Sequence, residues 1–412
     1  MRTFGLARTP RLLFGAGEIV RLGECLVGLG AHDVLVVISP SAVADPETRD
    51  GIMRVIREAG VGASYVRYDA LPGTLDPFEP GEGCCAEASP DVVDAIVADA
   101  TSARSGGRPE AIVAIGGGSA IDTGKALSAA FLEDGSITDY LEGVGTRTPS
   151  GRKLPFVAVP TTAGTGSEAT KNAVLSRPGF KKSLRHDRYV ADIALIDPRL
   201  QLSCPRSQTA ASGLDAITQL LEAYVSLTAN PVTDALALDG LRAAGRSFLP
   251  AVDRGESDVE ARADMAYAAC LSGICLANAG LGTVHGLAGA AGARSSVPHG
   301  VFCGTLLPHV VERTVAALSG HPEAHGTLRK LAAAGWALCG RESGFSGGSL
   351  EDQHRMLVGR LAELARVAAL PRLAGYGIDE ALARQIAEAG DNKQNPHQFD
   401  VDERYELLLR AL

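Results

Sequence analysis

The sequence lacks the features that mark several common classes of protein. No segment carries a dense run of basic residues, and the 412-residue chain has a formal net charge of -9, which argues against general nucleic-acid binding. No apolar stretch approaches the roughly 18 residues that a membrane-spanning helix requires. Hydrophobic residues make up 46% of the chain and charged residues 21%, which is typical of a soluble globular enzyme. We therefore expect a cytoplasmic protein with neither nucleic acid nor membrane as a partner.

The cysteines form neither a zinc-binding pattern nor a disulfide framework. The eight cysteines, which include the neighbours Cys84 and Cys85, stand at irregular spacing without a CxxC pair. Reduced, mostly buried thiols are expected. The arginine-bearing, acid-poor N-terminus has the composition of a transit peptide, but its apolar run breaks at Gly15. We predict a first strand and turn there instead.

The pattern of apolar residues changes near residue 200. Before it, apolar runs typical of buried strands alternate with helical patterns, which predicts βαβ units and a mostly parallel sheet. The strands are expected at 33–39, 64–70, 154–164 and the start of 110–131, and the helices at 46–59, 90–104 and the end of 110–131. After Pro198 the patterns are long and helical, at 209–226, 231–248 and 258–279. The turn-rich stretch 71–89 is expected to be a surface loop.

Two glycine-bearing loops follow predicted strands. Gly116-Gly117-Gly118-Ser119 stands between a strand and a helix, where exposed backbone N–H groups favour a pyrophosphate. The loop matches neither GxGxxG nor a P-loop, so by itself a tight turn explains it equally well. The second loop, residues 160–168 (PTTAGTGSE), adds hydroxyls after another strand. Two such loops at the carboxyl ends of strands in one sheet predict a nucleotide site.

Four polar residues in the second half suggest a metal site. Asp215 and Gln219 stand four apart and share one face of a predicted helix. His285 and His299 are each followed by glycine, which lets backbone or ligand come close. A carboxylate and two imidazoles suit a divalent transition metal, although an amide is an unusual fourth partner.

Motifs along almost the whole chain resemble those of the iron-containing (group III) alcohol dehydrogenase family, whose fold is like that of dehydroquinate synthase. The motifs, in order, are FGAGE (14–18), IGGGSAIDTGKA (115–126), PTTAGTGSEAT (160–170), ALIDP (194–198), GLDAITQLLEAYVS (213–226), NAGLGTVHGLAG (278–289), PHG (298–300) and KQNP (393–396). The resemblance implies an α/β NAD(P)-binding domain with a mostly parallel sheet at 1–198. It also implies an all-α domain for metal and substrate at 199–412. A homodimer is expected as well, from the resemblance and because twofold-symmetric dimers are the commonest soluble oligomers.

The resemblance also assigns roles to residues. It implies that Gly117, Gly118 and Ser119 hold the pyrophosphate with Asp122 nearby, that Thr161, Thr162 and Thr165 line the nucleotide and nicotinamide region, and that Lys181 reaches the ribose. The implied metal ligands are Asp215, Gln219, His285 and His299, with Fe²⁺ expected ahead of Zn²⁺. Without a metal, His285 or His299 would act as hydrogen-bond donor or general acid.

The residue that follows the first strand indicates whether NADH or NADPH is accepted. An acidic residue there would bind the adenosine 2′-hydroxyl and repel a 2′-phosphate. This chain has Ser39 where NAD-restricted relatives have aspartate. We expect NADPH to be accepted, alongside NADH.

Gln219 departs from the family pattern, which has histidine at that position. Three interpretations remain open: Gln219 ligates through its amide oxygen, water completes a three-ligand site, or the enzyme is metal-free, as the maleylacetate reductase branch is understood to be. Gly289 also departs, since some relatives have an active-site histidine there.

The expected reaction interconverts an alcohol and an aldehyde or ketone by hydride transfer. Arg294, Lys171 and Arg185 suggest a small anionic carbonyl substrate, although pairing with local carboxylates explains each of them equally well. An NAD-using lyase or cyclase and a nucleotide-binding protein without catalysis are the alternatives from other classes.

Overall fold

A computed structural model describes residues 3–78, 87–340 and 348–412. The chain folds into two compact units. The α/β unit comprises Ala7–Thr162 and Ser167–Cys204, and the helical unit comprises Met1–Leu6, Ala163–Gly166 and Pro205–Leu412. The domain boundary at 198/199 stays a prediction.

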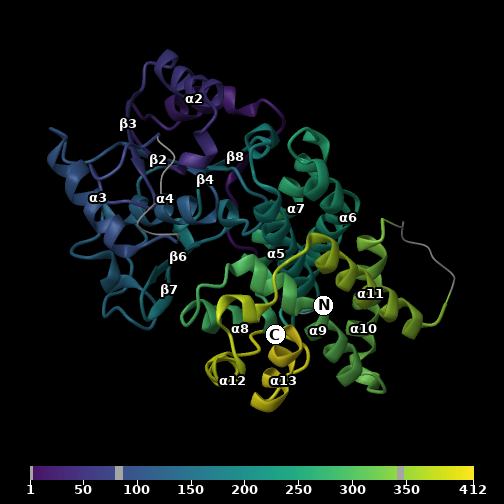
Figure 1. Cartoon of the computed structure of the whole chain (residues 1–412). Coiled ribbons are helices and arrows are strands. Elements are labelled where there is room, and N and C mark those ends of the chain that lie inside the picture. Colours follow the sequence, from purple (N-terminus) through teal and green to yellow (C-terminus); the bar gives the residue numbers. More distant parts are fainter. Residues whose placement is uncertain (1–2, 79–86, 341–347) are drawn as a thin grey trace. The chain divides into compact units, whose positions relative to one another are not determined.

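The α/β unit is built on a six-stranded parallel sheet with the order β1-β8-β5-β4-β2-β3 (Figure 1). Its strands are β1 (Arg11–Phe14), β2 (Asp33–Ile38), β3 (Gly62–Arg67), β4 (Ala111–Gly116), β5 (Phe156–Pro160) and β8 (Ile193–Ile196). A separate antiparallel hairpin consists of β6 (Asn172–Arg177) and β7 (Phe180–Arg185). The mostly parallel sheet predicted from the alternating patterns is confirmed, and so is the first strand near the N-terminus.

Helices cover both faces of this sheet. They are α1 (Leu22–Gly28), α2 (Pro46–Glu58), α3 (Pro90–Ser102) and α4 (Gly118–Ala130). Alternate residues of the central strands point to opposite faces, so Val36 packs with α1 and α2 while Val37 packs with α3 and α4. Because both faces are buried, every residue of β4 and β5 is buried, which explains their continuous apolar runs.

The helical unit contains the nine remaining α-helices of the described chain. These are α5 (Arg206–Val225), α6 (Pro231–Arg254), α7 (Val259–Ala279), α8 (Thr283–Gly292), α9 (His299–Leu318), α10 (His325–Leu338), α11 (Leu350–Ala368), α12 (Glu380–Ala389) and α13 (Val401–Ala411). Helix α5 is buried along most of its length and packs against α6, α7 and α9. The predicted helical patterns after Pro198 are confirmed.

One expectation about long apolar segments needs correction. Helix α9 is long and apolar enough to cross a membrane, and the bent pair α7–α8 would also qualify if counted as one span. More than half of the qualifying α9 window is buried, and α9 packs against α5, α8, α11 and α13. The buried core helix of a soluble protein can be equally long and apolar, so the length and hydropathy of α9 are weak evidence for a membrane-spanning helix.

Among the cysteines that the structure describes, Cys25, Cys270, Cys275 and Cys303 are buried, and none forms a disulfide with another described cysteine. Cys84 and Cys85 lie outside the described residues, as does much of the predicted surface loop 71–89.

Candidate functional site

The carboxyl ends of β2 and β4 meet at the point where the strand order reverses. The chain runs from β2 outward to β3 and then returns to place β4 on the other side of β2. Such a switch point is where open α/β sheets bind nucleotides. Ser39 follows β2, and its N–H donates to the carbonyl of Ile115 in β4 (2.9 Å). Ser39 and the glycine loop that follows β4 therefore lie at one edge of the sheet.

The glycine loop leaves the N-terminus of α4 open. Gly117 is the N-cap, and no side chain caps the first turn, which contains Gly118 and Ser119. These uncapped N–H groups can bind an anion. A Cβ on Gly116 would lie 2.9 Å from the Cβ of Ser39 and 2.6 Å from that of Ala120, so only glycine allows this close packing. The donor set fits the pyrophosphate of a dinucleotide.

The predicted threonines divide between the two units. Thr161 N–H donates to the Gly116 carbonyl (2.9 Å), and the Thr162 side chain faces Gly117, so both lie beside the glycine loop. Thr165 is exposed and belongs to the short segment Ala163–Gly166 of the helical unit.

Asp122 and Lys181 both have partners within the protein. Asp122 accepts from the Ser167 hydroxyl and from the Val174 N–H (3.0 Å), which ties α4 to the hairpin. Burial raises the pKa of Asp122, partly offset by Lys125. Lys181 pairs with Glu87. The cofactor roles predicted for Asp122 and Lys181 stay predictions.

A compact group of atoms that could bind a metal lies in the helical unit. Asp215 on α5, His285 on α8, and His299 and Cys303 on α9 each offer one atom, and all four atoms lie within 4.8 Å of one another. Asp215 Oδ1 lies 3.3 Å from His285 Nε2 and 3.5 Å from His299 Nε2. Among the described residues, no group donates a well-aligned hydrogen bond to this buried oxygen. Its lone pairs are therefore available to a metal, which would explain why a buried polar atom has no partner. The donor set and this orphaned oxygen fit a divalent transition metal.

The glycines that follow the two histidines allow close backbone packing. A Cβ on Gly286 would lie 1.9 Å from the carbonyl oxygen of Asp391, and one on Gly300 would lie 2.3 Å from that of Ala211. Neither position has room for a side chain, so the glycines fix α8 and α9 where they present the imidazoles.

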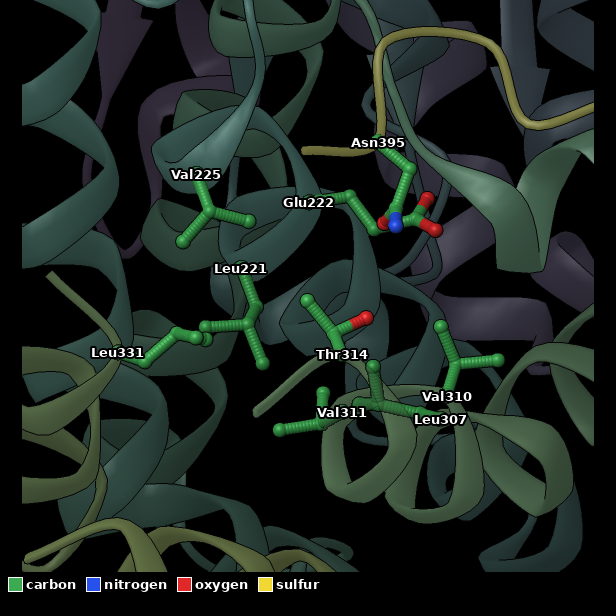
Figure 2. Close-up of a pocket in the computed structure, with 9 residues that line it drawn as sticks. All are labelled: Leu221, Glu222, Val225, Leu307, Val310, Val311, Thr314, Leu331 and Asn395. Carbon is green, nitrogen blue, oxygen red and sulfur yellow. The ribbon is translucent and has the colours of Figure 1, made fainter. Parts of the chain in front are cut away.

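Glu222 orients His285. Its Oε2 lies 2.7 Å from His285 Nδ1, and its Oε1 accepts from the Val284 N–H (2.7 Å). A carboxylate partner on Nδ1 directs Nε2 of the same ring toward the metal position, an arrangement common around metal-bound histidine. Figure 2 shows Glu222 beside Asn395, above apolar side chains of α5, α9 and α10 that line a small cavity. The carboxylate is thus sealed from solvent, with 4% of the residue exposed.

Gln219 contacts two polar side chains. Its Nε2 donates to Asp215 Oδ2 (3.3 Å), and its Oε1 lies 2.9 Å from the hydroxyl of Ser272 on α7, which also has the Ala269 carbonyl within reach (2.7 Å). The amide is buried and touches the carboxylate oxygen opposite to the one that faces the histidines.

The charged groups of this cluster shift one another's pKa values. Burial alone would lower the pKa of His285, but the thiol and the carboxylates around it raise that pKa well above its ordinary value. Burial would raise the pKa of Asp215, but the two imidazoles hold it below its ordinary value. Burial raises the pKa of Cys303 to about 12. A cation bound between these atoms would offset the carboxylate charge and compete with protons for the imidazole and thiol ligands.

The cations predicted to attract an anionic substrate differ in their surroundings. Lys171 pairs with Asp187 (2.6 Å), and Arg185 pairs with Glu142 (3.3 Å), so the local-pairing explanation holds for both. Arg294 is exposed and donates to the carbonyl of Ala290 (3.1 Å) at the end of α8. Gly289 is exposed, with open space where a side chain would begin.

Comparison with known proteins gives matches along the chain. A family model described as "Iron-containing alcohol dehydrogenase" matches residues 79–198, and one described as "Fe-containing alcohol dehydrogenase family, C-terminal" matches residues 209–412. The chain is 31% identical over 407 residues to the 1,3-propanediol dehydrogenase of Citrobacter freundii, covering 97% of this chain and 96% of the relative. It is 37% identical over 297 residues to long-chain-alcohol dehydrogenase 1 of Geobacillus thermodenitrificans, covering 72% and 70%. A solved structure of a 1,3-propanediol oxidoreductase matches with a TM-score of 0.84 at 29% identity, covering 100% of both chains.

Proposed function

The chain belongs to the iron-containing alcohol dehydrogenase family, and from that premise we propose how its residues serve the reaction. The family's members are NAD-dependent oxidoreductases that interconvert alcohols with aldehydes or ketones, and so is this chain. The particular substrate, the residues of the site and the assembly are our proposals.

The α/β unit holds the dinucleotide. The open first turn of α4, with Gly117, Gly118 and Ser119, binds the pyrophosphate through backbone N–H groups. Ser39 faces the adenosine ribose, and its small neutral side chain admits the 2′-phosphate of NADPH as well as the hydroxyl of NADH. The nicotinamide supplies the hydride chemistry itself.

The helical unit holds the metal through Asp215, His285 and His299. A bound divalent cation supplies Lewis-acid polarisation of the substrate oxygen. Asp215 lowers the net charge of the site, and Glu222 keeps His285 in the tautomer whose Nε2 faces the metal position. The observation that carries this proposal is the buried oxygen Asp215 Oδ1, which lies within 3.5 Å of both imidazoles and has no well-aligned hydrogen bond from the part of the chain that the structure describes.

A small alcohol or carbonyl compound is the proposed substrate. With Lys171 and Arg185 in local ion pairs, Arg294 alone supports the anionic substrate suggested by the sequence. We also propose a cytoplasmic homodimer. Its interface would include the edge strand β1, where the apolar side chains of Leu12 and Phe14 are each 42% exposed.

The test is a reduction assay on protein purified without oxygen and loaded with Fe²⁺ or Zn²⁺. Neutral and carboxylate- or phosphonate-bearing aldehydes are each offered with NADH and with NADPH. We expect stoichiometric oxidation of both cofactors, and loss of activity when the metal is removed by a chelator. Full activity of rigorously metal-free protein would contradict the metal role, and neutral aldehydes reacting as fast as charged ones would remove the anionic preference.

A further inference from the structure

Cys303 completes a four-atom group that has the spacing of a tetrahedral metal site. Its Sγ lies 3.8 Å from both His285 Nε2 and His299 Nε2. Metal bonds of about 2.0–2.1 Å to N or O and about 2.3 Å to S, at tetrahedral angles, place two N or O donors about 3.4 Å apart and an N and an S about 3.6 Å apart. The N–O separations here are 3.3 and 3.5 Å. These four separations are thus within a few tenths of an ångström of the tetrahedral values, and all four atoms lie within 4.8 Å of one another.

The position of Cys303 on its helix is well defined. It stands one turn after His299 on α9, so the two side chains share one face of that helix. It is fully buried, whereas the side chain of His299 is 32% exposed. The thiol therefore approaches the site from the protein interior and leaves the more open side, beside His299, for another ligand.

Gln219 is engaged elsewhere. Its N–H₂ donates to Asp215 Oδ2, the carboxylate oxygen that the histidines do not face, and its oxygen lies 2.9 Å from the Ser272 hydroxyl. A neutral amide oxygen on this side of the carboxylate is a poor competitor for a metal that has a thiolate within reach. The hydrogen bond to Oδ2 instead turns Oδ1 toward the imidazoles.

We propose that Cys303, as a thiolate, is the fourth protein ligand of the metal and that Gln219 is a positioning residue for Asp215. The proposal rests on the proposed metal role of Asp215, His285 and His299. When the metal binds, the S–H bond of Cys303 breaks, the proton passes to solvent, and the sulfur electron pair forms the metal–sulfur bond. The position where the family pattern has a histidine ligand can therefore hold a glutamine, because Cys303 on α9 supplies the fourth ligand.

A thiolate changes which metals the site prefers. Sulfur ligands favour Zn²⁺ and Fe²⁺ over Mg²⁺ and Mn²⁺, which prefer oxygen. The donor set of one carboxylate, two imidazoles and one thiolate should therefore retain Zn²⁺ strongly.

Cobalt substitution tests the assignment without relying on activity. Wild-type protein stripped of metal and loaded with one equivalent of Co²⁺ should show a thiolate-to-cobalt charge-transfer band in the near ultraviolet. The band should persist in Gln219→Ala and in the control Cys275→Ala, which removes another buried thiol of the helical unit, and should vanish in Cys303→Ser. Competition with a chromophoric chelator should show Zn²⁺ affinity reduced by more than about 100-fold in Cys303→Ser and by about 10-fold in Gln219→Ala.

Several outcomes would overturn the proposal. They are the absence of the band from the wild type, its survival in Cys303→Ser, or a larger loss of Zn²⁺ affinity in Gln219→Ala than in Cys303→Ser. If Cys303→Ser does not fold, the wild type and the two other variants still decide: the band must appear with Co²⁺ in the wild type, in Cys275→Ala and in Gln219→Ala, and must be lost when excess Zn²⁺ displaces the Co²⁺. An active wild-type enzyme without the band would refute the thiolate ligand and leave the proposed function intact. A charge-transfer band in a protein that does not turn over NAD(P)H would support the thiolate ligand and contradict the proposed function.

Discussion

The carboxylate of Glu222 holds the imidazole of His285, with Oε2 2.7 Å from Nδ1. The same carboxylate accepts the backbone N–H of Val284 through Oε1, so ring and backbone are fixed by one side chain. Glu222 lies seven residues after Asp215 on α5, and two helical turns bring both to the same face. Helix α5 therefore supplies both a ligand of the proposed metal and the group that orients another ligand on α8.

Glu222→Gln should weaken metal binding without unfolding the protein. Both Glu222 oxygens accept hydrogen bonds, and an amide has only one oxygen, so either His285 or Val284 would face an N–H₂ donor. We expect Zn²⁺ affinity to fall by about 10- to 100-fold, measured by chelator competition. The exposed Glu260→Gln on α7 is the matched control and should leave the affinity unchanged. Equal affinity in both variants would show that Glu222 has no role in orienting His285.

Gln219→His should rescue the loss caused by Cys303→Ser. A histidine at position 219 places an imidazole one helical turn from Asp215, on the face that carries the other ligand of α5. In the Cys303→Ser background we expect Gln219→His to restore Zn²⁺ affinity to within about 10-fold of the wild type, with no charge-transfer band in the Co²⁺ form. A double variant as weak as Cys303→Ser alone would mean that position 219 cannot reach the metal.

Three of the four residues that the structure brings together in the helical unit, and the two loops at the sheet edge, could be named from the sequence because each lies in a local pattern; their roles in binding stay predictions. Ser39 and Gly117 follow apolar strands, and the ends of adjacent parallel strands must meet. Cys303 was missed, although its spacing of four from His299 on a helix would have indicated it. Glu222 was also missed, although its spacing of seven from Asp215 places both residues on one face of α5.

Other contacts could not be predicted from spacing. Ser272 is 53 residues from Gln219 and meets it only because α7 packs against α5. The pairing of Lys171 with Asp187 depends on where the chain turns after β7. The assignment of Thr165 to the helical unit also follows from packing: Gly166, next to it, lies so close to Gly273 of α7 that a Cβ on Gly166 would come within 2.5 Å of it.

Ser39→Asp should make the enzyme selective for NADH. A carboxylate at the end of β2 would accept from the adenosine 2′-hydroxyl and repel a 2′-phosphate. One to a few kcal/mol of repulsion at contact distance predicts a fall in kcat/KM for NADPH of about 10- to 100-fold. The measurement is kcat/KM for both cofactors with one aldehyde, and the NADH value, expected to hold or rise, is the internal control. An equal fall with both cofactors would place Ser39 away from the ribose.

Glu168→Gln should reduce the pH dependence of stability. Glu168 is buried in the α/β unit, and burial raises its pKa from 4.5 to about 7. Between these values the folded protein keeps a proton that the unfolded chain has released, so the wild-type free energy of unfolding falls as the pH rises from about 4.5 to 7. Glutamine cannot titrate, so urea unfolding at pH 5 and pH 7 should show a smaller difference for Glu168→Gln than for the wild type. The exposed Glu58→Gln on α2 should retain the wild-type difference. If Glu168→Gln instead keeps the full difference, another group is responsible for it.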